Sequence, residues 1–380
     1  MSLAELVVDD LRCIGHAELQ LAPGQNLIYG GNGSGKTSLL ESIFLLGRGR
    51  SFRTRNSERL IRYGQDRLVV FGRTYGLTPV GSPLRVDSGS VGSPLYTGHG
   101  QALGVQVSRS EGTTARISGA TASSLTELTQ VFPVQVIDPG VHKLVEEGGH
   151  RRRRWMDWAV FHVEHAFGEW WVRYTRALKQ RNAALRTQPA QAGAWDAELV
   201  KLGELISDAR RRFVEELLPY WRQSVLALSG LEPELHYFRG WAQDVPLAVA
   251  LAASRARDEA KRLTHPGPHR ADVLIRMNGR PAKDVLSRGQ QKLVAVAMTL
   301  AQLNLLREVT QTTSTLLLDD PAAELDGEHL GRFIEQVKHL RSQLVLTSLR
   351  PESQLFGTPD RVFHVEQGRV QPGYAPRYPV

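Results

Sequence analysis

The sequence lacks the features that mark secreted and membrane-spanning proteins. Cys13 is the one cysteine among 380 residues, so neither an internal disulfide nor a cysteine-rich metal site can form, which indicates a reducing compartment. Such a lone cysteine is usually a small apolar core residue, and we expect Cys13 to be buried. Residues 1–10 lack a basic start and a long apolar run, and no apolar stretch elsewhere reaches the roughly 18 residues that cross a bilayer. We therefore predict a cytoplasmic protein without a membrane partner.

The composition is that of an ordinary folded protein with a basic surplus. Hydrophobic residues make up 41% and charged residues 23%, values that exclude a disordered or fibrous chain, and the length allows two or three domains. Lys and Arg (47) exceed Asp and Glu (39), and the formal net charge of +8 favours a polyanionic partner such as nucleic acid or acidic lipid.

The first part of the chain has a predominantly β pattern. Short β-type stretches lie at Leu6–Val8, His16–Leu21 and Leu27–Tyr29, and the last leads into a glycine-rich segment with a helical pattern from Ser34. Between about residues 64 and 119, β-like runs alternate with clusters of Gly, Ser, Thr and Pro, which predicts an antiparallel β subdomain. Its expected strands, with one more buried strand after them, are Leu68–Phe71, Leu84–Val86, Val105–Val107 and Pro133–Asp138.

The middle of the chain has a helical pattern, which separates two parts of an α/β core. Helical segments run from His142 through Arg262. A β pattern returns at Ala271–Met277, where the following Asn278-Gly279 predicts a tight hairpin. A helix at about Ser287–Leu306 and strands at Thr315–Leu318 and Gln343–Thr347 follow. We therefore predict an α/β fold whose core is interrupted by an inserted, mostly helical lobe.

Residues 30–37 carry a phosphate-loop motif. They match G-x-x-x-x-G-K-[ST] at every fixed position, between a predicted strand and a predicted helix. Consecutive backbone N–H groups of such a loop surround phosphate oxygens, Lys36 reaches the β- and γ-phosphates, and the Thr37 hydroxyl binds Mg²⁺. We assign the whole motif to binding ATP with Mg²⁺: Gly30, Gly31, Asn32, Gly33, Ser34, Gly35, Lys36 and Thr37.

A pair of carboxylates follows the apolar strand at residues 315–318. Asp319 and Asp320 come at the C-terminal end of this strand, the edge at which open α/β sheets bind ligands. We predict that Asp319 is the second Mg²⁺ partner and that Asp320 orients or deprotonates the attacking water.

The segment Leu286–Lys292 resembles the signature of the ABC-type ATPases. It reads Leu-Ser-Arg-Gly-Gln-Gln-Lys, and Ser287 with the N–H groups beside Gly289 can form an anion site at a helix N-terminus. Ser287 as a plain helix N-cap is compatible with that role. The resemblance implies that Ser287, Gly289 and Gln290 meet the γ-phosphate of a nucleotide held by a second subunit, and hence an ATP-bound head-to-tail homodimer. It also assigns Arg12 and Thr347 to the nucleotide site and the loop at residues 323–326 to the subunit contact.

Further segments, in order along the chain, resemble the RecF family of bacterial recombination and repair proteins, which is related to the SMC-type ATPases. They are Gly49–Thr54, Arg151–Arg153 before Trp155–Asp157, Tyr174 with Leu178–Asn182, and Gly267–Arg270. The resemblance implies an ABC/SMC-type P-loop ATPase head with an antiparallel β subdomain and an inserted helical lobe. We expect residues 1–140 to form the N-terminal part of the ATPase domain, residues 141–264 the helical lobe, and residues 265–380 the C-terminal part of the ATPase domain. Ala323 replaces a usual serine, Arg288 a usual glutamine, and residues 76–104 differ from the family.

The same resemblance implies a slow, DNA-stimulated ATPase of recombinational repair and replication restart. It would dimerise on ATP, bind double-stranded DNA and single/double-strand junctions, and help load RecA with RecO and RecR. An ABC transporter-type ATPase subunit and a DNA-binding scaffold with vestigial ATPase activity remain alternatives. Transporter subunits usually carry a histidine after the last core strand, where this chain has Thr347-Ser348.

Basic residues concentrate between residues 151 and 186, where nine Lys or Arg stand against three acids. We predict phosphate contacts with little sequence preference from this lobe and from Arg50–Arg55. The candidates are Arg50, Arg53, Arg151, Arg152, Arg153, Arg154, Lys179 and Arg181.

Aromatic residues lie among these basic residues at helical spacing. This spacing favours aromatic side chains that are buried in the core over side chains that stack on unpaired bases. These aromatic residues are Trp155, Trp158, Trp170, Trp171 and Tyr174.

Overall fold

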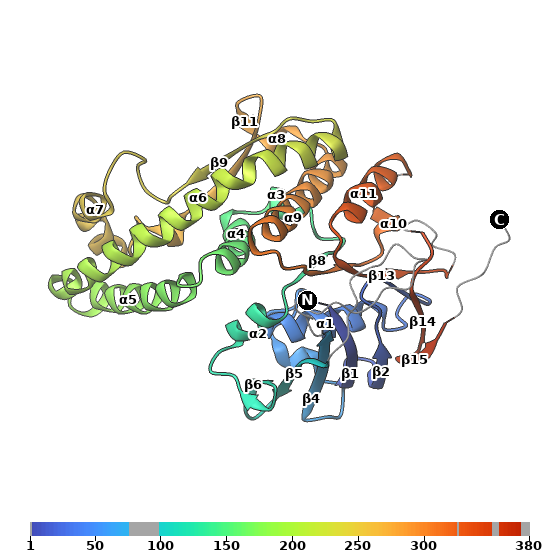
Figure 1. Ribbon diagram of the computed structural model, residues 1–380. Coiled ribbons are helices and arrows are strands. Elements are labelled where there is room, and N and C mark those ends of the chain that lie inside the picture. The colour runs from blue at the N-terminus through green and yellow to red at the C-terminus, as the bar shows by residue number, and fades with distance from the viewer. Residues whose placement is uncertain (1, 76–98, 325–326, 352–356, 374–380) are drawn as a thin grey trace, which may run out of the picture. The chain divides into compact units, whose positions relative to one another are not determined.

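The computed structural model describes residues 2–75, 99–324, 327–351 and 357–373 (Figure 1). These residues form two compact units, unit 1 with Met1–Pro139 and Thr312–Val380, and unit 2 with Gly140–Gln311. The first division lies one residue from the predicted boundary. The second does not follow the prediction, because residues 265–311 group with the helical unit.

Unit 1 contains an antiparallel sheet in the order β2-β1-β4-β5-β6-β7. Its strands are β1 (Leu3–Leu11), β2 (Ile14–Gln20), β4 (Arg67–Tyr75), β5 (His99–Ser108), β6 (Gly112–Ile117) and β7 (Ala120–Thr121). The predicted antiparallel β subdomain is therefore confirmed. The strand expected at residues 84–86 lies outside the described residues, as does most of the unusual stretch at 76–104.

A second sheet of unit 1, in the order β15-β14-β3-β13-β12-β8, carries the phosphate-loop strand. Its strands are β3 (Gln25–Tyr29), β8 (Val134–Ile137), β12 (Thr315–Leu318), β13 (Gln343–Ser348), β14 (Arg361–Glu366) and β15 (Arg369–Pro372). Those from β14 to β8 pair in parallel, and β15 is antiparallel to β14. Parallel pairing brings the C-terminal ends of β3, β13 and β12 to one edge, although they are far apart in sequence.

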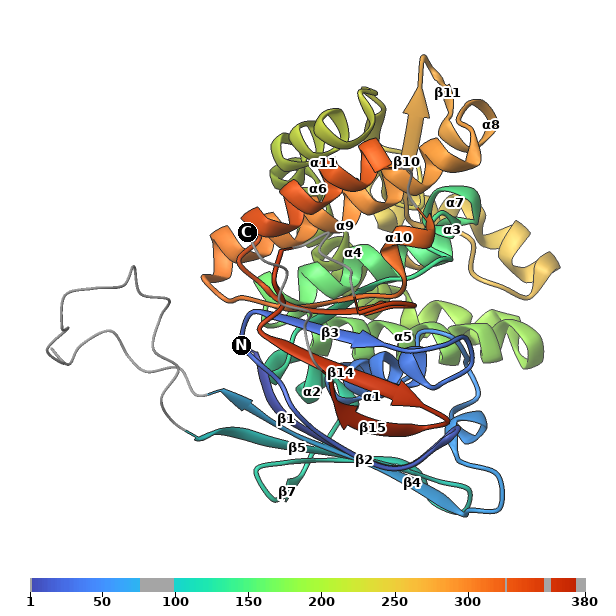
Figure 2. The same ribbon diagram turned by 90° about the vertical axis from the view of Figure 1, so that its right-hand side faces the viewer.

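Helix α1 (Lys36–Arg48) forms the centre of the unit 1 core (Figure 2). Its residues Leu39, Leu40 and Ile43 are fully buried in one cluster with residues of both sheets, such as Leu6 and Val345. A helix with apolar residues around most of its surface is buried on all sides, and this holds α1 rigidly behind the phosphate loop. The other helical elements are η1 (Ser57–Leu60), α2 (Leu125–Val131), α10 (Pro321–Glu324) and α11 (Gly327–His339).

Unit 2 is mostly helical, as predicted, but also contains a small antiparallel sheet. The helical elements are α3 (Lys143–Glu146), α4 (Gly149–Val163), α5 (Phe167–Thr187), η2 (Pro189–Trp195), α6 (Asp196–Ser229), α7 (Leu247–Lys261), η3 (Pro268–Arg270), α8 (Ala282–Val285) and α9 (Arg288–Thr310). The sheet order is β11-β10-β9, with β9 (Glu234–Phe238), β10 (Asp272–Met277) and β11 (Arg280–Pro281). Asn278 and Gly279 have φ values of 52° and 74°, which makes the predicted hairpin. Strand β9 lies inside the block expected to be helical, because it pairs with β10 across a long sequence separation.

Helix α9 explains why residues 265–311 belong to unit 2. Most of its side chains are buried, and Gln302 Nε2 donates to the backbone oxygen of Trp155 on α4 at 2.8 Å. By length and composition α9 alone among the described helices could cross a membrane, which the sequence expectation overlooked. However, 72% of its most apolar window is buried inside the protein, as in the core helix of a globular unit.

Candidate functional site

The phosphate loop connects β3 to α1 and is closely packed on the β14–β15 turn. A Cβ atom at Gly30 would lie 2.1 Å from the Val365 oxygen, and Gly35 has a φ of 119°, so both positions require glycine. The Gly368 N–H donates to the Ser34 oxygen at 2.8 Å. The β14–β15 hairpin, which the sequence analysis did not predict, therefore supports the loop from behind.

Polar groups inside the loop fit a phosphate. Lys36 is 8% exposed, and its Nζ donates to the backbone oxygens of Gly30 at 2.7 Å and Gly31 at 2.9 Å. Burial lowers the pKa of Lys36, whereas the nearby Asp320 and Asp319 act in the opposite direction. The buried Ser34 Oγ has no hydrogen-bond partner within the described residues, a state that costs about 1–3 kcal/mol and that a phosphate oxygen would relieve.

Thr37 and Asp319 meet at the edge of the sheet. Thr37 Oγ1 donates to Asp319 Oδ1 at 3.0 Å and lies 3.1 Å from Oδ2, although the residues are 282 positions apart. A hydroxyl and a carboxylate are the oxygen donors that Mg²⁺ takes, so the pair fits this ion. The structure thus brings together the two residues that the sequence analysis assigned to the metal.

Thr347, which the resemblance assigns to the nucleotide site, contacts the two aspartates that follow β12. It is fully buried, and its Oγ1 donates to Asp319 Oδ1 at 2.9 Å while accepting from the Asp320 N–H at 2.9 Å. Asp320 itself has a φ of 49°, which aspartate tolerates as a single residue. Thr347 is therefore a positioning residue that orients the Asp319 carboxylate and fixes the backbone at Asp320, because β13 pairs with β12 beside it.

Arg12 lies in the tight turn between β1 and β2, next to the phosphate loop. The turn lies against the loop, since Cys13 Sγ would be 3.2 Å from a Cβ atom at Gly35. Arg12 Nη2 donates to Glu41 Oε1 at 3.0 Å, and Nε donates to Oε2. Cys13 is exposed, so the expectation that it is buried is wrong: the turn position leaves its side chain outside the strand pair.

The signature segment of unit 2 begins helix α9. Ser287 is its N-cap: Ser287 Oγ accepts from the Gln290 N–H at 3.3 Å, and Gln290 Oε1 accepts from the Ser287 N–H at 3.0 Å. Ser287 is exposed, and a Cβ atom at Gly289 would have no neighbour nearer than Ser287 Oγ at 4.0 Å. The positive end of a long helix therefore faces open space. Of the predicted subunit-contact loop, residues 325 and 326 lie outside the described part of the chain.

Two of the predicted DNA contacts are wrong. Arg181 is 2% exposed and Arg152 is 8% exposed, so neither can reach a phosphate on the surface. Arg152 instead forms a two-point ion pair with Asp272, with both N–O distances at 2.8 Å. Sequence alone does not distinguish such a buried cation from its exposed neighbours.

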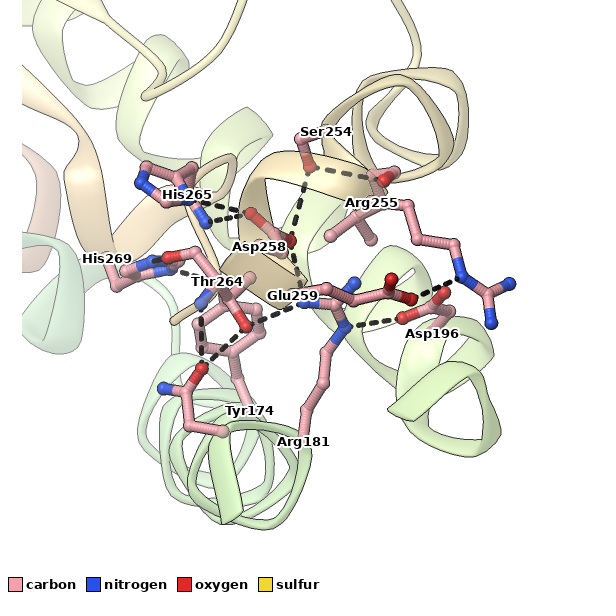
Figure 3. A network of polar contacts seen from close by, with 12 residues as sticks. Tyr174, Arg181, Asp196, Ser254, Arg255, Asp258, Glu259, Thr264, His265 and His269 are labelled. Atoms are coloured by element: carbon pink, nitrogen blue, oxygen red, sulfur yellow. Dashed lines mark hydrogen bonds and ion pairs between the residues drawn. The ribbon is translucent and has the colours of Figure 1, made fainter. Parts of the chain in front are cut away.

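Arg181 is the centre of a buried polar network that joins α5 and α7 (Figure 3). Its Nε donates to Asp196 at 2.7 Å, and its Nη1 donates to Asp258 at 2.8 Å and to Thr264 at 2.9 Å. Asp258, fully buried, also accepts from His265. Because removing one partner of a buried ion pair leaves an uncompensated charge, Arg181 stabilises the unit.

The remaining basic candidates divide by exposure. Arg50, Arg53, Arg151, Arg154 and Lys179 are exposed, whereas Arg153 is half-buried and its Nη1 donates to the Ala271 oxygen at 2.6 Å. The core alternative is confirmed for Trp155, Trp158 and Tyr174, which are at most 8% exposed. Trp170 and Trp171 are half-buried.

The Arg181 network also contains His269, a titratable group that we expect to make the stability of the protein depend on pH. Burial, together with the neighbouring cations Arg270, Arg153 and Arg210, lowers the pKa of His269 to about 4. His269 Nδ1 lies 2.7 Å from the Tyr174 hydroxyl and Nε2 lies 3.1 Å from the Thr264 oxygen, contacts that a neutral ring with its proton on Nε2 satisfies. The unfolded chain, with an ordinary histidine pKa, binds this proton more readily, so stability present above pH 6.5 is lost as the pH falls toward 4.

We expect wild-type protein to lose about 2 kcal/mol more unfolding free energy than the variant His269→Gln between pH 7.5 and pH 5. Chemical denaturation at the two pH values measures this difference. The variant His165→Gln, at an exposed histidine, should keep the wild-type pH dependence. Identical pH dependence in wild type and His269→Gln would contradict the assignment.

Comparisons with known proteins place this fold and site in a class. Residues 2–371 match the family described as RecF/RecN/SMC N terminal domain. A solved Smc head bound to the C-terminal winged helix domain of ScpA covers 98% of this chain and 96% of its own, with a TM-score of 0.56 and 14% identity, which shows the fold. Together with the two sheets and the phosphate loop, these matches define an ABC/SMC-type P-loop ATPase head.

Full-length relatives narrow the class. Proteins named "DNA replication and repair protein RecF" from Shewanella loihica and Pseudomonas syringae pv. syringae are 36% and 38% identical to it, covering 97% of this chain and 99% and 98% of their own. A solved structure described as the recombination mediator protein RecF-ATP in the RecFOR pathway covers 98% of both chains, with a TM-score of 0.85 and 25% identity. The chain therefore belongs to the RecF family.

Glu41 is the functional candidate that sequence reasoning missed. It is fully buried, yet it lies on the apolar helix α1, five residues after Lys36. A lone carboxylate in an otherwise apolar helix was a detectable signal, because a buried charge requires a partner. Its partners Arg12, Ser51 and Arg53 lie 10 to 29 positions away in the sequence, but they follow other elements and become evident as partners only in three dimensions.

Proposed function

We propose that this protein is an ATP-dependent DNA-binding ATPase of DNA replication and recombinational repair. It dimerises on ATP, binds double-stranded DNA and single/double-strand junctions while closed, and releases them after slow hydrolysis. The observation that carries the proposal is the Thr37–Asp319 pair beside a phosphate loop with an unpartnered Ser34 hydroxyl. The names of the relatives, "DNA replication and repair protein RecF", support the same process.

Different residues of unit 1 bind the phosphates, hold the metal ion and activate the attacking water. The loop N–H groups, Ser34 and Lys36 bind the phosphates, and Thr37 with Asp319 holds Mg²⁺, which supplies positive charge to the phosphate oxygens when bound. Asp320 orients the attacking water and accepts its proton. Thr347 keeps the Asp319 carboxylate and the Asp320 backbone in place through its buried hydroxyl.

The second copy of the chain completes each site. Ser287 and the N-terminus of α9 from that copy donate to the γ-phosphate, a role supported by their exposure and by the open space at Gly289. A head-to-tail homodimer then forms only when the nucleotide lies between the two copies. ADP, which lacks the γ-phosphate, should not hold it together.

The exposed cations supply the DNA contacts. DNA phosphates are bound by Arg50 and Arg53 of unit 1 and by Arg151, Arg154 and Lys179 of unit 2, which gives binding with little sequence preference.

The protein partners are RecR, which acts with RecO, and indirectly RecA. The compartment is the cytoplasm. The RecFOR pathway named for a solved relative supports RecR and RecO as partners.

The proposal is tested by measuring fluorescence anisotropy on duplex and gapped DNA with ATP and with ADP, while light scattering follows the oligomeric state. We expect tighter DNA binding with ATP, together with a dimer. An absence of DNA binding with either nucleotide would reject the proposal in favour of an ATPase with a protein partner, such as a transporter-type subunit.

Replacing exposed cations should change the salt dependence of DNA binding. In the double variant Arg50→Ala and Lys179→Ala, each lost phosphate contact should reduce the slope of log Kd against log salt concentration by about 1. Titrations at several salt concentrations measure the slope, and Lys338→Ala, at an exposed lysine of α11, is the control. An unchanged slope in the double variant would remove both residues from the DNA interface.

A further inference from the structure

A buried carboxylate in unit 1 contacts both the nucleotide side and the candidate DNA side of the site. Glu41 is fully buried on α1. Its Oε1 accepts from Arg12 Nη2 at 3.0 Å and also from Ser51 Oγ, while its Oε2 accepts from Arg12 Nε and lies 3.9 Å from Arg53 Nη1. One side chain thus joins the β1–β2 turn to the segment that follows α1.

On the nucleotide side, Glu41 holds Arg12 in a fixed orientation. Within the described residues, the hydrogen bonds of the Arg12 side chain go to Glu41 through Nε and Nη2, which leaves Nη1 available to an anion. The side chain is 26% exposed, and its turn lies against Gly35 of the phosphate loop. A two-point ion pair restricts the guanidinium far more than a single contact would.

On the other side, Glu41 organises residues 51–54. Ser51 Oγ donates to Glu41 and accepts from the N–H groups of Arg53 at 2.9 Å and Thr54 at 3.0 Å, so the chain winds around this hydroxyl. Phe52 packs edge-on against Phe44 of α1, with ring centroids 5.4 Å apart. The side chain of Arg53 is 47% exposed beside this anchor.

The backbone connects the same two elements a second time. The Arg12 N–H donates to the Leu60 oxygen at 2.8 Å, and Leu11 pairs with Ile61. The segment from Ser51 to Ile61 is therefore attached at one end to Glu41 and at the other to the turn that carries Arg12. A displacement at either element changes the contacts of the other.

We propose that Glu41 is a positioning residue that couples nucleotide binding at Arg12 to DNA binding at residues 50–55. When Arg53 turns from Glu41 to a DNA phosphate, the carboxylate charge is shared by fewer cations and holds Arg12 more firmly against the nucleotide site. The coupling is reciprocal, because two sites that share one set of contacts change each other's affinity by the same factor. This inference rests on the proposed function.

The test is the variant Glu41→Gln, which keeps the size of the side chain and removes its charge. DNA affinity is measured with a slowly hydrolysed ATP analogue and with ADP, and nucleotide affinity with and without DNA. In wild type the two affinity ratios should agree, within the usual 5- to 150-fold range of such coupling. In Glu41→Gln both ratios should fall at least about 3-fold below those of wild type without reaching 1, because ATP-dependent dimerisation still favours DNA binding, while DNA affinity with ADP stays within about 3-fold of wild type.

A second variant, Ser51→Ala, leaves the Arg12–Glu41 ion pair intact and removes only the link to residues 51–54. It should lower both ratios without changing nucleotide affinity in the absence of DNA, and it decides the question if Glu41→Gln does not fold. Glu335→Gln, at an exposed glutamate of α11, is the control for charge removal. Wild-type ratios in folded Glu41→Gln and Ser51→Ala overturn the inference, whereas nucleotide-independent DNA binding by wild type rejects the proposed function itself.

Discussion

Replacement of Lys36 by alanine is expected to weaken ATP binding by at least about 100-fold and to abolish ATP-dependent dimerisation. Lys36 Nζ lies inside the phosphate loop, 2.7 Å from the Gly30 oxygen, and is the one buried ammonium among the described residues of the loop. Hydrogen bonds to charged groups contribute about 1.5–3 kcal/mol each, and 1.4 kcal/mol corresponds to a factor of ten in affinity. Isothermal titration calorimetry with ATP and Mg²⁺ measures the loss.

The matched control is Lys338→Ala, which removes an exposed lysine of unit 1 and should bind ATP as wild type does. Because Lys36 also donates to backbone oxygens of the loop, a melting curve must show that Lys36→Ala is folded. A folded Lys36→Ala that retains wild-type ATP affinity would refute the phosphate-loop assignment.

Replacement of Asp320 by asparagine is expected to slow hydrolysis by about 100-fold or more, with ATP affinity and dimerisation within about 3-fold of wild type. Asparagine cannot accept the proton of the attacking water, and general bases typically contribute 10²–10⁴-fold. The Asp320 N–H bond to Thr347 is a backbone contact, so the substitution preserves it. Single-turnover release of phosphate measures the chemical step, and DNA should stay bound for longer.

Asp284→Asn, at an exposed aspartate of unit 2, is the control and should hydrolyse ATP at the wild-type rate. Asp320→Asn with wild-type turnover would remove Asp320 from catalysis. Wild-type protein that binds ATP and DNA but releases no phosphate would instead favour the scaffold with vestigial ATPase activity.

Local patterns predicted the elements well where neighbouring residues decide the conformation. The strand, loop and helix around residues 27–46 form as expected, because the glycines of the loop and the apolar spacing of α1 are encoded within a few residues. The hairpin at Asn278-Gly279 forms for the same reason, since both residues tolerate positive φ. Strands β9, β14 and β15 were missed, because each depends on a partner strand for its stability.

Burial was predicted less well than secondary structure. In the sequence, Arg152 and Arg181 have the same kinds of neighbouring residues as arginines that are exposed. In the structure, each is buried and pairs with an aspartate at least 15 positions away. Cys13 shows the opposite error, since a turn position overrode the general tendency of cysteine to be buried. A charge pattern along the chain therefore identifies a basic region without identifying which of its members face solvent.

The sequence by itself determined the phosphate loop, the paired aspartates and the signature segment, because each motif is a contiguous run whose chemistry depends on residue types at fixed spacing. Only the tertiary structure decided the direct contact of Thr37 with Asp319, the place of Thr347 against the Asp319 carboxylate and the Asp320 backbone, and the link of Arg12 to Ser51 through Glu41. These contacts depend on strand order and on helix packing, over sequence separations from 10 residues for Glu41–Ser51 to 282 for Thr37–Asp319. Such long-range pairings are selected by the burial of the whole core, which no short stretch of sequence specifies.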